Sequence, residues 1–254
     1  MNVNIQLDPK RLGFEAGKKA AALIKEAIKK NGSANIILAT GSSQFETLNQ
    51  LIQEKGIEWN KVSMFHLDEY IGLPLSHKAS FRKYLKERFL DKVPKLKSVN
   101  LIDGESDPDK ECKRLSELIK KSPIDVALVG IGENGHLAFN DPPADFEMEK
   151  PYIIADLNRA CRTQQVNEEW FKSISEVPKQ AISMSVKQIM LSKYIVCSVP
   201  GIRKAKAVKD CLEQPISNLY PASILQHHSD CCLFLEKESA SLLKNKESYV
   251  TIKV

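Results

Sequence analysis

A glycine-rich loop contains the most informative group of chemically active residues in the chain. Gly130, Gly132 and Gly135 follow an apolar run, and His136 comes next, in the segment HLAFNDPP. Imidazole is the side chain best suited to proton transfer near neutral pH. The GxGxxG spacing also occurs in dinucleotide-binding loops, but the residues after His136 do not read as a helix and no dinucleotide-type βαβ unit follows. We therefore predict that the loop displays a histidine for acid–base chemistry; a structural loop histidine is the alternative.

Two adjacent carboxylates, Asp68 and Glu69, follow a second apolar run. Adjacent acids are usually solvated, but at the end of a strand one of them can point into a cleft and act as a base. His66, inside the same run, is better explained as a packed histidine. The segment therefore predicts a candidate general base, and the pattern alone leaves open which carboxylate provides it.

Two turns carry groups suited to binding an anion. In the first, glycine permits close backbone approach and hydroxyls can donate to phosphate oxygens, with a helix N-cap as the alternative; its residues are Thr40, Gly41, Ser42 and Ser43. In the second, Arg203 and Lys204 follow Gly201 in the first turn of an expected helix. The helix dipole disfavours cations there, so one or both could meet a phosphate, and a solvated pair is the alternative.

Short apolar runs alternate with amphipathic helical patterns along the chain. We expect strands at residues 35–39, 62–67, 99–102, 126–129, 181–186, 194–199, 232–235 and 249–253. We expect helices at residues 11–30, 45–52, 81–89, 110–120, near 168, 203–212 and 222–226. This alternation predicts a single α/β domain over residues 1–254, with a doubly wound, mainly parallel sheet covered by helices on both faces. The four polar segments fall at the carboxyl ends of expected strands, where ligands gather in such sheets.

Composition excludes several classes of protein. The 254 residues are 43% hydrophobic and 27% charged, which is typical of a folded chain. The longest apolar stretch, residues 124–131, is far shorter than the roughly 18 residues of a membrane helix, and the first residues lack the pattern of a secretory signal. The charge of +5 comes from lysines interleaved with acids, which favours a small anionic ligand over nucleic acid. We expect a cytoplasmic protein without a membrane partner.

The six cysteines are scattered and form no CxxC pair. Such spacing indicates neither a zinc site nor a redox motif. We therefore expect free thiols, and neither a metal nor a cofactor.

Taken in order, these segments resemble the glucosamine-6-phosphate deaminase family, which shares its fold with 6-phosphogluconolactonases and sugar-phosphate isomerase domains. The matching segments are the turn 40–43, residues 68–73 with 80–81 beyond them, the loop GIGENGHLAFNDPP, residues 201–205 and residues 220–223. Tyr70 and the run 139–142 are similar to the deaminase branch rather than to the lactonase branch. The resemblance implies a three-layer, Rossmann-like sandwich that converts a 2-amino-2-deoxyhexose 6-phosphate to a ketohexose 6-phosphate with loss of ammonia.

The resemblance also implies residue roles. Asp68 corresponds to the base that moves a proton from C2 to C1, and His136 to the group that opens the pyranose ring. Asp141 corresponds to the acid that orients this histidine, and Asn134 lies at a further catalytic position beside it. The residues that correspond to the phosphate site are Thr40, Gly41, Ser42, Ser43 and Lys204.

Three positions depart from the family pattern. Asn134 stands where the family usually has an aspartate, and Asp141 where it usually has a glutamate. Glu169 stands where the family has an arginine that helps to hold phosphate, and Arg159 or Arg162 could take over this role. These changes suggest a divergent subgroup of the family.

Four functions remain open on the sequence alone. The first is glucosamine-6-phosphate deamination, giving fructose 6-phosphate and ammonia. The same chemistry on galactosamine 6-phosphate is the second, because the contacts that read C4 stereochemistry are not visible in a sequence. A 6-phosphogluconolactonase and a non-catalytic sugar-phosphate sensor are the others. The expected partner is an amino-sugar phosphate, and a homo-oligomer is possible.

Overall fold

The main sheet is parallel throughout, and most of its strands are the short apolar runs seen in the sequence. The computed structural model describes residues 1–244, 246, 250 and 251. The strand order is β11-β1-β10-β9-β6-β2-β3-β5. The strands are β1 (Asn2–Gln6), β2 (Ala34–Leu38), β3 (Val62–His66), β5 (Ser98–Asn100), β6 (Val126–Val129), β9 (Tyr194–Val199), β10 (Cys231–Glu236) and β11 (Val250–Thr251). The predicted doubly wound parallel sheet is confirmed.

Helices cover both faces of this sheet. Those that do so are α1 (Pro9–Asn31), α2 (Phe45–Gln53), α3 (Phe81–Arg88), α4 (Pro108–Lys120), α6 (Val186–Met190) and α7 (Ala205–Glu213), whereas α5 (Arg159–Asn167) packs with a second, smaller sheet. The long helix α1 begins where the Asp8 carboxylate accepts a hydrogen bond from the N–H of Arg11, and it ends at Gly32, whose φ of 75° suits glycine. Within the described residues, no helix combines the length and apolarity needed to cross a membrane.

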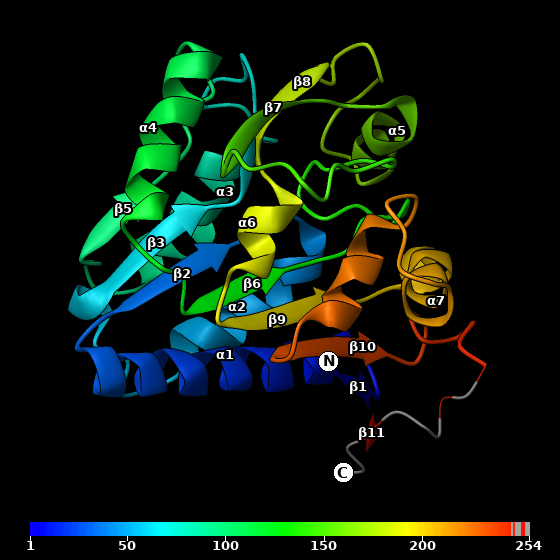
Figure 1. Cartoon of the computed structure of the whole chain (residues 1–254), viewed down its shortest axis with the longest axis horizontal. Helices are drawn as coiled ribbons and strands as arrows, with labels where there is room; N and C mark the ends of the chain where they lie inside the picture. The colour runs from blue at the N-terminus through cyan, green and yellow to red at the C-terminus, as the bar shows by residue number, and fades with distance from the viewer. Residues whose placement is uncertain (245, 247–249, 252–254) are drawn as a thin grey trace.

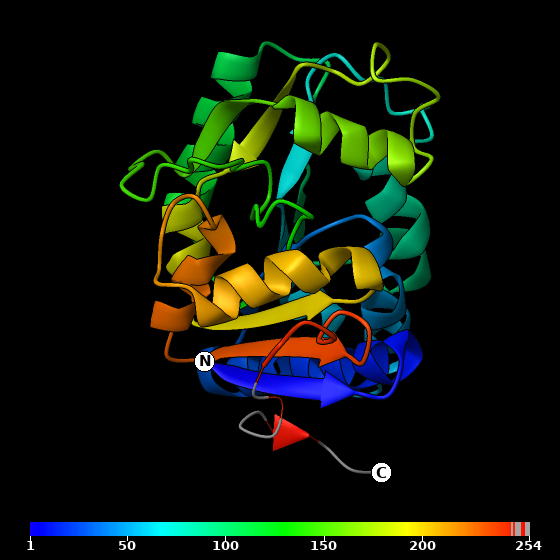
Figure 2. The same ribbon diagram turned by 90° about the vertical axis from the view of Figure 1, so that its right-hand side faces the viewer.

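Side chains alternate between two apolar cores across the sheet. On β2, Ile36 and Leu38 pack with α1 and α2, whereas Ile37 packs on the opposite face with α4 and α7. The strand β6 divides in the same way, with Leu128 on the first face and Val129 on the second. Figures 1 and 2 show the resulting layers, with α1 below the main sheet and α7 above it.

A smaller antiparallel sheet, in the order β4-β8-β7, lies beside the main one. Its strands are β4 (Asp68–Tyr70), β8 (Gln180–Met184) and β7 (Tyr152–Asp156). In Figure 1, β7 and β8 lie at the top with α5, far from α1. A third core, including Tyr70, Phe81 and Phe139, joins this sheet to α3 and α5.

Several elements differ from the sequence expectations. The strand expected at 181–186 lies in the small antiparallel sheet, and the small sheet's other two strands and β1 were not predicted. The helix expected near residue 168 is α5, which ends at Asn167, and residues 221–227 form a 3₁₀ helix. Of the strand expected over 249–253, only Val250–Thr251 falls among the described residues.

The chain reverses its direction of progress across the main sheet between β2 and β6. From β2 it moves outward to β3 and β5, and from β6 it moves the other way to β9 and β10. In open α/β sheets the crevice for ligands forms at the carboxyl ends of the strands at such a point. The four polar segments identified in the sequence follow β2, β3, β6 and β9 and therefore meet there.

Candidate active site

A cavity lies at this carboxyl edge, and most of the predicted site residues line it. Those that do are Thr40, Gly41, Ser42, Ser43, Asp68, His136 and Lys204. The other lining residues are Ala39, Leu67, Phe81, Gly130, Ile131, Gly132, Ala138, Phe139, Gln164, Gln165 and Glu168. Asn134, Asp141 and Arg162 were also predicted to belong to the site, but they do not line the cavity.

The two adjacent carboxylates have different environments because they alternate along β4. Asp68 lines the cavity, and burial, together with the neighbouring charge of Glu69, raises its pKa to about 8. Glu69 is fully buried and accepts hydrogen bonds from the N–H groups of Phe81 and Arg82 and from the Ser80 hydroxyl, at the start of α3. Asp68 is therefore the candidate base, and Glu69 is a structural cap.

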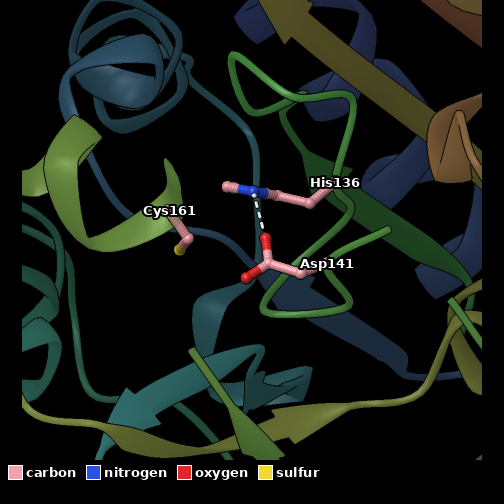
Figure 3. Close-up of side chains that lie close together, drawn as sticks. All are labelled: His136, Asp141 and Cys161. Atoms are coloured by element: carbon pink, nitrogen blue, oxygen red, sulfur yellow. Dashed lines mark hydrogen bonds and ion pairs between the residues drawn. The ribbon is translucent and has the colours of Figure 1, made fainter. Parts of the chain in front are cut away.

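A hydrogen bond joins His136 to Asp141, and Figure 3 shows this pair in close-up. The Nδ1 atom of His136 lies 3.1 Å from Oδ1 of Asp141. Burial opposes ionisation of Asp141, but hydrogen bonds from His136, the Asn134 amide and the Asn158 N–H outweigh it, and the pKa stays below its usual value. An ionised Asp141 accepts the Nδ1 proton, which leaves Nε2 of His136 as the basic nitrogen.

The glycine-rich loop shapes the position of the histidine ring. The ring packs directly on Gly132, where an added Cβ would lie 2.2 Å from Nε2 of His136. Gly135 adopts a φ of 86°, which side chains other than glycine rarely tolerate. The loop closes through hydrogen bonds from Gly132 N–H to the His136 carbonyl and from Gly135 N–H to the Gly132 carbonyl. Glycine is thus required at 132 by contact and at 135 by conformation.

Asn134 contacts His136 and Asp141 but does not line the cavity. Its amide donates to Oδ1 of Asp141 at 2.9 Å, and its Oδ1 accepts from the N–H of His136 at 3.2 Å. Asn134 therefore fixes the carboxylate and the loop, and it does not face the substrate space. This differs from the direct catalytic position expected from the resemblance.

The turn after β2 forms one end of the cavity. Gly41 has a φ of 91°, and its carbonyl accepts a hydrogen bond from the Tyr84 hydroxyl. The Gln44 amide donates to Ser43 Oγ and to the Val129 carbonyl, which ties the turn to β6. The turn runs into a 3₁₀ turn and then α2, so it lies at the start of a helix, where free N–H groups favour an anion.

Lys204 and Glu168 complete this end of the cavity. The Nζ atom of Lys204 lies 3.9 Å from Oε1 of Glu168, and the two side chains are 9% and 7% exposed. Burial lowers the pKa of Lys204, and the nearby carboxylate of Glu168 opposes that shift. Among the described residues that line the cavity, Lys204 carries the only positive charge. Glu168 was missed because the sequence offers no reason to expect a carboxylate beside a turn that is predicted to bind an anion.

Arg162 does not reach the cavity, which corrects the prediction that it binds phosphate. Its guanidinium donates to the carbonyl of Ile174. Arg162 is not among the lining residues, whereas Gln164 and Gln165 on the same helix α5 line the cavity. Glu169 is exposed, and the acidic residue that faces the cavity is its neighbour Glu168.

Cys161 joins the histidine–aspartate pair to form the group of side chains shown in Figure 3. The ligand atoms of His136, Asp141 and Cys161 all lie within 4.8 Å of one another, so they could hold a metal ion. Burial, with the charges of Asp141 and Asp68, raises the pKa of the Cys161 thiol far above its ordinary value. A cation would have to displace that proton before the sulfur could serve as a ligand. All six cysteines are free, as expected.

The fold and the cavity define a doubly wound α/β protein whose site combines a buried carboxylate, a histidine–aspartate pair and a glycine–serine turn at the start of a helix. Residues 7–234 match the family described as glucosamine-6-phosphate isomerases/6-phosphogluconolactonase. The chain belongs to this family, which confirms the resemblance found in the sequence.

Its relatives include glucosamine-6-phosphate deaminases from two bacteria. The protein from Oenococcus oeni is 36% identical over 233 residues, which are 92% of this chain and 96% of that protein. The protein from Streptococcus agalactiae serotype III is 37% identical over 231 residues, which are 91% of this chain and 96% of that protein. These relatives confirm that the chain is an enzyme of the glucosamine-6-phosphate deaminase type.

Solved structures show the same architecture. A monomeric glucosamine-6-phosphate deaminase superposes with a TM-score of 0.85 at 32% identity, covering 95% of this chain and all of that one. The 6-phosphogluconolactonase from Thermotoga maritima superposes with a TM-score of 0.75 at 18% identity, covering 93% of this chain and all of that one. The second likeness supports the fold alone.

Proposed function

We infer that the chain deaminates glucosamine 6-phosphate, giving fructose 6-phosphate and ammonia. The observation that carries this inference is the placement of Asp68, His136 and the turn 40–43 around one cavity. The reaction needs a base at C2, a proton relay for ring opening and a site for a phosphate. The cavity offers a group for each need.

The first step opens the pyranose ring. A proton leaves the O1 hydroxyl and one reaches the ring oxygen O5, so that C1 becomes an aldehyde. Nε2 of His136 accepts and returns this proton, because Nδ1 is committed to Asp141. Asp141 stabilises the imidazolium while it exists and holds the ring in one orientation.

The second step moves a proton from C2 to C1. The Asp68 carboxylate takes the C2 proton and then delivers it to C1. Over the same step O1 gains a proton and the amino nitrogen loses one, which leaves a hydroxyl at C1 and a carbon–nitrogen double bond at C2. Water adds to this imine and ammonia departs, giving the C2 ketone. A carboxyl group whose pKa is about 8 suits both halves of this transfer, because it gains and loses a proton with little cost near neutral pH.

The phosphate is expected at the turn. The N–H groups of Gly41, Ser42 and Ser43 lie at the start of a helix, and the Lys204 ammonium supplies the positive charge.

The cavity also bears on domain organisation and location. Its lining residues come from positions 39 to 204, which supports the prediction that residues 1–254 form one domain. The substrate is a charged sugar phosphate that does not cross a bilayer, so we expect the enzyme to act in the cytoplasm.

The test is a direct comparison of three substrates. Purified protein is incubated separately with glucosamine 6-phosphate, galactosamine 6-phosphate and 6-phosphogluconolactone, while ammonia release and lactone loss are measured. We expect ammonia from glucosamine 6-phosphate at the highest kcat/KM. Faster release from the galactosamine compound would change the epimer but keep the chemistry. Rapid lactone hydrolysis without ammonia from either amino sugar would overturn the proposal.

A further inference from the structure

The anion-binding end of the cavity already holds a carboxylate. Oε2 of Glu168 accepts hydrogen bonds from the Ser42 hydroxyl at 3.2 Å and from the indole N–H of Trp170 at 3.3 Å. Oε1 accepts from the Gln164 amide at 2.8 Å and lies 3.9 Å from the Lys204 ammonium. A hydroxyl, an indole N–H, an amide and an ammonium are the donors that a site for an anion would offer.

Two of these donors are the groups expected to bind the substrate's phosphate. The Ser42 hydroxyl has a single proton, so it cannot donate to Glu168 and to a phosphate oxygen at the same time. Lys204 is the only cation among the described residues of the lining, so two anions would have to share it. The carboxylate and a phosphate therefore compete for the same partners.

The charges of Lys204 and Glu168 also indicate that the carboxylate competes with a phosphate. With Lys204 and Glu168 both buried and facing each other, the positive charge of one largely offsets the negative charge of the other. A phosphate monoester that enters beside an ionised Glu168 brings two more negative charges into a poorly solvated space. Repulsion there is weakly screened, so the phosphate and the carboxylate disfavour each other.

We propose that Glu168 is an internal competitor of phosphate: its carboxylate occupies the phosphate subsite when no substrate is bound, and the substrate's phosphate binds by displacing it. The proposal rests on the proposed function for the identity of the anion. Displacement weakens the binding of every phosphate by a similar factor. A whole sugar phosphate still binds through its sugar contacts, whereas inorganic phosphate has none and no longer fills the subsite at concentrations where it would otherwise compete.

Replacing Glu168 with Gln tests the proposal, because Gln keeps the size of the side chain and removes its charge. We expect the Kd of inorganic phosphate, measured by calorimetry on the whole protein, to fall about tenfold. The KM for glucosamine 6-phosphate should fall by a similar factor while kcat stays within about twofold. Glu169→Gln is the matched control, because Glu169 is the adjacent exposed glutamate, and it should change neither constant.

An unchanged or raised Kd in Glu168→Gln would overturn the proposal, because it would mean that the carboxylate supports the subsite. If Glu168→Gln is poorly folded, as judged by its melting temperature, Glu168→Ala is used instead, and the Kd of inorganic phosphate is again expected to fall. The phosphate titration does not depend on turnover, so it tests the role of Glu168 independently of the deaminase function. Tighter phosphate binding without ammonia release refutes only the deaminase function, whereas ammonia release with unchanged phosphate binding refutes only the role of Glu168.

Discussion

Asp68 and Glu69 are neighbours in the chain, yet their carboxylates lie on opposite sides of β4. Asp68 faces the cavity, whereas Glu69 is fully buried against the first turn of α3. The cause is the two-residue period of a strand, which sends successive side chains to opposite faces. One carboxylate is thereby available for chemistry and the other for structure. Replacing Asp68 should therefore affect turnover, whereas replacing Glu69 should affect stability.

Asp68→Asn should abolish turnover while leaving substrate binding nearly intact. The amide has almost the shape of the carboxyl group but cannot take a proton from C2 or return one to C1. The measurements are kcat from ammonia release and the Kd of glucosamine 6-phosphate from calorimetry, made possible by the lack of turnover. A kcat close to that of the parent would show that another group is the base.

The same variant should change the pH dependence of stability. Because the folded-state pKa of Asp68 is raised from 3.8 to about 8, the folded protein holds a proton here that the unfolded chain has lost. The free energy of unfolding therefore falls as the pH rises between about 4 and 8, and Asp68→Asn removes that loss. We expect the variant to be more stable than the parent at pH 8, with an advantage that shrinks toward pH 4. Urea unfolding across this range measures the difference, and the exposed Asp109→Asn serves as the control.

Glu69→Gln should cost stability rather than chemistry. The carboxylate accepts from the N–H groups of Tyr70, Phe81 and Arg82 and from Ser80 Oγ. An amide directs its own N–H₂ at some of these donors and leaves them unsatisfied in a buried site, at a cost of about 2–3 kcal/mol. Urea denaturation gives the change in the free energy of unfolding. Glu117→Gln, an exposed change on α4, should be neutral, and an equally neutral Glu69→Gln would refute the capping role.

Much of the site could be predicted because its parts are local in the sequence. The turn 40–43, the loop that displays His136, and Lys204 each follow a strand of a parallel sheet, so strand order alone brings them to one edge. The choice between Asp68 and Glu69 could be made only with the resemblance, since the pattern did not reveal that these polar residues form β4. Strand β1 escaped prediction because its alternating Val3 and Ile5 do not form a continuous apolar run.

The features that were missed depend on contacts between distant residues. Cys161 lies beside His136 and Asp141 only because α5 packs over the glycine-rich loop. Arg162 was offered as a replacement for the family arginine that is missing at Glu169, but its guanidinium donates to the carbonyl of Ile174. Glu168 meets Ser42 across 126 residues, and no local pattern encodes such a contact.

Asp141→Asn should lower kcat by roughly a hundredfold with little change in KM. An amide presents N–H₂ to Nδ1 of His136 in one of its orientations, which favours the wrong tautomer, and it cannot stabilise the imidazolium. Asp141→Glu should recover part of the activity, because it restores the charge with a longer reach. If Asp141→Asn and Asp141→Glu lowered kcat equally, the charge of the partner would not matter and the relay role would be wrong.

Lys204→Ala should mainly raise KM, by about tenfold or more, while kcat changes little. The ammonium lies at the end of the cavity where we propose that the phosphate binds, and it takes no part in the proposed proton transfers, so its loss should weaken the ground state and the transition state alike. Arg203→Ala is the matched control. The Arg203 side chain is half exposed, and its Nε lies 3.4 Å from Glu133, outside the cavity. The KM for glucosamine 6-phosphate, measured by steady-state kinetics, is compared between the two variants. A larger rise in KM for Arg203→Ala than for Lys204→Ala would show that Arg203, and not Lys204, binds the phosphate.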